Sequence, residues 1–156
     1  MSTRVINVAT SLSRTERLLS LAPWLSRVVM FPPVLILGLI SFRFLTNPAH
    51  AIPAVTLHTP EAFTDTRVIG AGTLTLLAML VTFLLSDDRL WMGHMQLVTF
   101  MGVTLIVRVF GFLNDGTTLA MGNQRLITIV EIIFLTLNAL GLVVQIHLLK
   151  QSEVRQ

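Results

Sequence analysis

The chain has 156 residues, of which 53% are hydrophobic and only 12% carry a charge. A soluble globular domain usually has about twice that charged fraction, so the composition excludes an ordinary soluble domain and indicates a protein that folds in a lipid bilayer. The net charge of +3 comes mostly from arginines beside apolar runs, which predicts contact with lipid headgroups and argues against nucleic-acid binding. The absence of cysteine excludes disulfides and thiolate chemistry.

The N-terminal part combines a basic segment with the first apolar run. Residues 1–26 mix arginines with leucines and a tryptophan, which predicts an amphipathic helix lying in the membrane interface; a disordered basic leader is the alternative. The first membrane span is expected at about residues 28–46, because the run continues past Arg43 if its guanidinium reaches outward to the headgroups. Pro32 and Pro33 are expected either to kink this span or to mark its true start.

A long polar connection is expected over residues 47–66, where three prolines interrupt the apolar sequence. The second span is predicted at about residues 67–86, with candidate N-caps in the Thr64-Asp65-Thr66 segment. Small side chains recur along this span at helical spacing and predict the face on which a neighbouring helix packs. They are Ala71, Thr75, Ala78 and Thr82.

Two further spans follow, separated by a polar turn. The third is predicted at about residues 90–113 and the fourth at about residues 125–149, with a charged tail over residues 150–156. The Asn114-Asp115-Gly116 segment between them is a turn signal. The sequence therefore predicts an all-α fold, an integral membrane four-helix bundle over residues 27–149, with or without an interfacial helix in front of it.

The positions of lysine and arginine predict the orientation. An even number of spans places both termini on one side of the membrane. The segments on that side hold seven Lys and Arg residues, against four toward the other side. Because positive residues collect on the cytoplasmic side, both termini are predicted to be cytoplasmic.

Two charges lie inside the last two spans, Arg108 in the third and Glu131 in the fourth. Counting from the turn between these antiparallel spans puts both about 9 Å below the same membrane edge. A lone charge at that depth costs on the order of 3 kcal/mol, so we expect the two side chains to pair. Two interpretations stay open: a structural clamp that fixes the helix register, or a functional carboxylate in a proton or ligand path.

The same counting places Met101 opposite Asn138, and His94 opposite Gln145. The three residues that this counting pairs on each helix, counting Arg108 and Glu131, recur every seven positions, so each set lies on one face. The sequence therefore predicts His94 and Gln145 as a second structural polar pair.

The candidate binding residues are Arg108, Glu131, Arg67, Asp115 and Asn138. Arg67 and Asp115 belong to the polar residues expected at the outer mouth of the bundle, where they could bind an anionic headgroup or a small acid. Helix caps and interface charges brought together by the topology are the alternative.

His94 and His147, with Met92 and Met95 nearby, raise the question of a metal or haem site. His147 lies two residues from Gln145, about 200° round the helix, so the two side chains cannot both face the third span. No catalytic triad, Gly-rich phosphate loop or paired acidic metal motif stands out. We therefore expect no metal, no cofactor and no enzymatic activity.

Three stretches carry a resemblance to a known family: Asp65 to Gly72 (DTRVIGAG), Val107 to Gly116 (VRVFGFLNDG), and Glu131. They resemble the small four-span bacterial membrane proteins grouped as domain of unknown function family 4345, over about residues 28–148. The resemblance implies four helices and a place in the bacterial inner membrane, and it implies no known activity. Ala71 stands where the pattern has a second glycine.

These observations favour a non-enzymatic accessory or partner-binding subunit that contacts the lipid bilayer and a membrane protein partner or a second copy of the chain. The alternative is a small-molecule or lipid-binding carrier with its polar site around Arg108 and Glu131. Nucleic acid is not an expected partner.

Overall fold

The computed structural model describes residues 14–51, 57–114 and 124–154. It contains four long helices: α1 (Arg14–Thr46), α2 (Pro60–Leu85), α3 (Leu90–Asn114) and α4 (Gln124–Val154). Two short 3₁₀ turns, η1 (Pro48–His50) and η2 (Asp87–Arg89), follow α1 and α2. The described part of the chain contains no strand, so the all-α prediction is confirmed.

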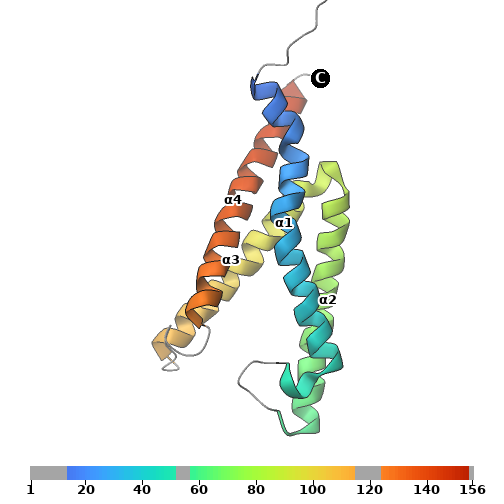
Figure 1. The fold of residues 1–156 in the computed structure, drawn as a ribbon, viewed down its shortest axis with the longest axis vertical. Helices are drawn as coiled ribbons and strands as arrows, with labels where there is room; N and C mark the ends of the chain where they lie inside the picture. Colours follow the sequence, from blue (N-terminus) through green and yellow to red (C-terminus); the bar gives the residue numbers. More distant parts are fainter. Residues whose placement is uncertain (1–13, 52–56, 115–123, 155–156) are drawn as a thin grey trace, which may run out of the picture.

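The helices form two hairpins. Helix α1 packs along α2, and α3 packs along α4 (Figure 1). The hairpins meet at the end of the molecule where α4 ends, and they diverge toward the other end. Each helix contains a segment long and apolar enough to cross a membrane: Ser20–Thr46, Pro60–Leu85, Asp87–Asn114 (with η2) and Arg125–Gln151. The protein is therefore a multi-pass membrane protein built as a four-helix bundle.

Helix α1 begins at Arg14 and continues through Pro23, Pro32 and Pro33. Residues 14–26 thus belong to the same continuous helix as the first span, whose apolar part begins at Ser20, while residues 1–13 lie outside the described residues. The adjacent prolines do not mark the helix start. A proline inside a helix removes one backbone hydrogen bond and crowds the carbonyl four residues earlier, but membrane helices tolerate it because neighbouring helices and local adjustments satisfy the freed backbone groups.

Helix α2 begins earlier than predicted. Thr59 is its N-cap, and the Thr59 hydroxyl accepts a hydrogen bond from the Ala62 N–H at 3.2 Å. Pro60 fits the first helical position because the N–H that proline lacks would have no helical partner there. The prediction of a cap within residues 64–66 is therefore wrong. It treated Pro60 as a helix breaker, but a proline disrupts only the interior of a helix and is compatible with the first turn.

The predicted packing face of α2 is also wrong. The four small residues are all exposed: Ala71, Thr75, Ala78 and Thr82. The two threonine hydroxyls donate to carbonyls four residues earlier, so these polar groups are satisfied within the helix and can face lipid. The close approach to α1 is at Gly70, where a Cβ would lie 2.8 Å from Cβ of Phe44.

The core lies where the hairpins meet. Its buried apolar residues come from α1, α2 and α3: Met30, Val34, Leu37, Leu80, Leu90, Leu97 and Met101. Arg27 ties α1 to the end of α2 and to the turn that follows, because its Nε donates to the Leu84 carbonyl at 2.9 Å and its Nη2 pairs with Asp87. Many other large apolar side chains are exposed, as expected of helices whose outer faces contact lipid.

Candidate functional site

Arg108 and Glu131 form an ion pair between α3 and α4. Nε of Arg108 donates to Oε2 of Glu131 at 2.9 Å, and Nη2 donates to Oε1 at 2.8 Å. Each side chain is only 19% exposed. Two parallel N–H···O bonds give such a pair a fixed geometry as well as energy. The predicted pairing of these two charges is confirmed.

A groove lies beside this pair, between the two hairpins. Its volume is about 450 Å³ and its walls come from all four helices. Leu37, Met101 and Phe134 are among its apolar lining residues, and Glu131 is the charged one. The two hairpins whose residues line this groove diverge from each other away from the end where α4 ends (Figure 1). A half-buried glutamate therefore lines a groove whose other lining side chains are apolar or threonine.

A second polar cluster lies where the hairpins come together. His94 is fully buried on α3, and its Nδ1 lies 2.9 Å from Oδ1 of Asn138, which is fully buried on α4. The imidazole lies against Gly141, where a Cβ would be 2.5 to 2.9 Å from three ring atoms. Gln145 donates instead to the hydroxyl of Ser26 on α1, at 2.8 Å. This cluster joins α1, α3 and α4 through buried polar contacts.

The hydrogen bonds of Asn138 fix the protonation of the imidazole. Its Nδ2 donates to the Phe134 carbonyl at 2.8 Å, so its Oδ1 faces His94 as an acceptor. Nδ1 of His94 must therefore carry a proton, and in the neutral imidazole Nε2 is then the nitrogen with the lone pair. Among the described residues, Nε2 is buried without a hydrogen-bond partner.

The predicted pairing of His94 with Gln145 is wrong. His94 lies beside Gly141, about one helical turn from Gln145. The error came from setting the register on Arg108 and Glu131. Helical side chains lean toward the N-terminus of their own helix, and these ends point in opposite directions on antiparallel helices. Two long side chains can therefore pair even when their Cα atoms lie about one helical turn apart along the helix axes.

The other predicted binding residues do not gather at one site. Asn138 belongs to the cluster around His94, and Arg67 is exposed on α2, in the other hairpin. Asp115 lies outside the described residues. The sequence reasoning missed Ser26 and Gly141. Gly141 falls between Asn138 and Gln145 on the polar face of α4, and a glycine there was the signal for a large side chain from α3.

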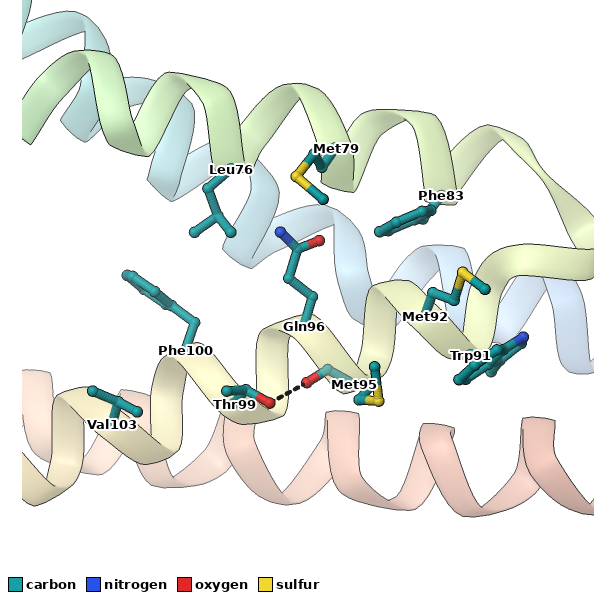
Figure 2. A pocket seen from close by; sticks show the side chains of 10 residues that line it. All are labelled: Leu76, Met79, Phe83, Trp91, Met92, Met95, Gln96, Thr99, Phe100 and Val103. Carbon is teal, nitrogen blue, oxygen red and sulfur yellow. Dashed lines mark hydrogen bonds between the residues drawn. The ribbon is translucent and has the colours of Figure 1, made fainter.

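A further groove, of about 530 Å³, lies between α2 and α3 (Figure 2). Gln96 points from α3 toward α2 between apolar side chains that include Leu76 and Met79. Its Oε1 is buried and has no hydrogen-bond partner within the described residues. Helix α3 thus carries unsatisfied acceptors on two faces, Nε2 of His94 and Oε1 of Gln96.

Comparisons with known proteins assign no family. No protein-family model, no curated protein and no solved structure matches the chain. The resemblance to domain of unknown function family 4345 therefore stays a prediction.

Proposed function

We propose that this multi-pass membrane protein binds an amphiphile in the groove between the two hairpins. The apolar chain of the amphiphile occupies the groove, and a hydrogen-bond donor at its polar end, such as an amino headgroup, contacts Glu131. The observation that carries this proposal is the position of Glu131, whose carboxylate borders a groove of about 450 Å³ that is otherwise lined by apolar and threonine side chains.

The chemistry of the ion pair supports a ligand with a donor. An ionised carboxylate is an acceptor with about four lone-pair sites, and Arg108 takes two of them in the bidentate contact. The arginine offsets most of the negative charge, so the site suits a hydrogen-bond donor more than a bare cation. Ligand pockets in proteins commonly combine apolar walls with a few polar groups that fix orientation.

We also propose that the protein lies in the bacterial inner membrane with both termini in the cytoplasm. The excess of lysine and arginine on the side of the termini supports this orientation. The resemblance to domain of unknown function family 4345 supports the bacterial assignment.

The test uses an alkyl amine with a dansyl group at the far end of its chain, added to the purified protein in detergent. We expect saturable binding with enhanced fluorescence, and binding about tenfold weaker to Glu131→Gln with little change in the thermal midpoint, because glutamine keeps an acceptor for Arg108. The trimethylated amine, which has the charge but no N–H, should bind weakly. A Glu131→Gln protein that fails to fold would instead establish the structural clamp.

A matched pair of variants on α1 tests the groove itself. Ile36 lines the groove, whereas Leu39 on the same helix is 62% exposed and does not line it. Ile36→Trp should fill the groove and abolish probe binding, and Leu39→Trp should leave binding unchanged. Equal binding to both variants would place the probe elsewhere and overturn the proposal.

A second candidate is a partner-binding subunit. It is favoured by Gln96, whose unsatisfied Oε1 lies in the groove between α2 and α3. A partner helix with an amide or hydroxyl donor would satisfy this acceptor, since such interhelical bonds contribute to association in membranes. Co-purification of a partner that is lost in Gln96→Leu and retained in Thr99→Leu would support this function.

A further inference from the structure

The fully buried His94 has an acceptor that the protein itself does not use. Its Nδ1 donates to Asn138, and its Nε2 has no hydrogen-bond partner among the described residues. A buried acceptor without a partner is unfavourable, and most such atoms in native proteins contact a protein donor, a water or a ligand. The question is which group reaches Nε2.

A cavity of about 420 Å³ leads to this imidazole from the lipid side, between α1 and α4. His94 lines it and is fully buried, whereas Leu25, Leu140 and Val144 line it and are 45 to 60% exposed. The histidine therefore forms the floor and the exposed residues form the rim. The cavity is separate from the groove beside Glu131, since the two have no lining residue in common.

Ser26 supplies a second polar group in the wall of the same cavity. Its hydroxyl oxygen accepts a hydrogen bond from Gln145. The hydroxyl proton is not donated to any acceptor in the described part of the chain, which leaves Ser26 able to donate. Two polar residues thus line the cavity among apolar side chains: His94, whose buried Nε2 has no partner in the described part of the chain, and Ser26, whose hydroxyl can donate.

We propose that this cavity binds an apolar molecule with a hydroxyl group, whose O–H donates to Nε2 of His94 and whose oxygen accepts from Ser26. A hydroxyl both donates and accepts, so one small neutral group can satisfy both side chains. An ether or a ketone lacks the donor that Nε2 needs. A charged headgroup would be costly to bury in this cavity, which has no charged side chain among its lining residues.

Two kinds of membrane molecule carry such a hydroxyl: aliphatic alcohols and phenols, including the reduced form of a quinone. The test uses the full-length protein in detergent and a long-chain alcohol that carries a photoreactive diazirine on its chain. We expect cross-links to peptides that line the cavity on α1 and α4. Unlabelled hexadecanol and a decyl-substituted hydroquinone are added separately as competitors of the labelling. The stronger competitor shows whether the cavity prefers an aliphatic alcohol or a phenol. The methyl ether of hexadecanol should not compete.

His94→Phe keeps a ring against Gly141 and removes the acceptor, so labelling should fall about tenfold. His147→Phe is the matched control, because His147 is exposed and contacts Gln151. If His94→Phe fails to fold, Leu140→Trp tests the cavity with the histidine intact. Leu140 lines the rim, whereas Val143 is 66% exposed and does not line the cavity. Leu140→Trp should abolish labelling and Val143→Trp should not.

Three results would overturn the proposal: competition by the ether as strong as by the alcohol, equal labelling of the Leu140→Trp and Val143→Trp proteins, or cross-links confined to peptides outside the cavity. None of these results depends on the amine site, because the variants here leave Glu131 and its groove unchanged.

Discussion

Replacing Gly141 by alanine tests the packing of the buried polar cluster. A Cβ at this position would lie 2.5 Å from Cε1, 2.7 Å from Nε2 and 2.9 Å from Nδ1 of His94. The imidazole is held from the other side, because His94 is fully buried and its Nδ1 contacts Asn138. The ring must therefore move, and the contact with Asn138 stretches or breaks.

The expected cost follows from these contacts. Inserting one methyl group into a close-packed site costs typically about 1–3 kcal/mol. Losing a polar contact between membrane helices adds about 0.6 kcal/mol, and the better helix propensity of alanine returns up to about 1 kcal/mol. We therefore expect Gly141→Ala to destabilise the protein by about 1–3 kcal/mol.

The assay is unfolding in mixed micelles with increasing SDS, followed by tryptophan fluorescence. Gly102→Ala is the control, because a Cβ at Gly102 meets no atom within 4 Å. In a His94→Ala background the cost of Gly141→Ala should disappear, which would give a coupling energy of about 1 kcal/mol or more. Equal stability of the Gly141→Ala and Gly102→Ala proteins would refute the close contact between the imidazole and the glycine.

Three further predictions use the same unfolding assay. Arg108→Met should destabilise the protein by about 3 kcal/mol because it leaves the Glu131 carboxylate unpaired, and adding Glu131→Gln should restore most of the loss; no restoration would argue against the pair. Asn138→Leu should cost about 1–3 kcal/mol because Nδ1 of His94 then lacks an acceptor, and a neutral result would mean that His94 has another partner. Gly70→Ala should cost about 1–3 kcal/mol because its Cβ would lie 2.8 Å from Cβ of Phe44, whereas Gly72→Ala, with no atom within 4 Å, should be neutral.

The fold was largely predictable from the sequence, because apolar runs of about 20 residues and the polar segments between them reflect the thickness of the bilayer. The limits of the helices were less predictable. Pro60 opens α2 and Pro32 lies inside α1, so the same residue type starts one helix and is tolerated within another. Only the residues that surround each proline in the folded protein distinguish a proline that starts a helix from one that lies inside it.

The candidate site was predictable only in part. Arg108 and Glu131 were found because a charge in an apolar run needs a partner, and equal depth left few choices. The partners of His94 and Gln145 were not found, because depth along a helix does not show which neighbour a side chain faces. Gln145 faces Ser26 on α1, a contact between residues 119 positions apart. The grooves depend on how far the hairpins diverge, which no local pattern in the sequence encodes.

The divergence of the two hairpins is the central claim, and the distance between spin labels on α1 and α4 tests it most directly. The chain has no cysteine, so pairs of introduced cysteines label cleanly. Leu21 lies near the start of α1 and Lys150 near the end of α4, so this pair reports on the end where the hairpins meet; Phe42 near the end of α1 and Ile129 near the start of α4 report on the other end, and all four residues are exposed. Pulsed electron paramagnetic resonance should give a longer distance for the second pair than for the first. Equal distances would show that the hairpins stay in contact along their length, and the groove beside Glu131 would then be closed.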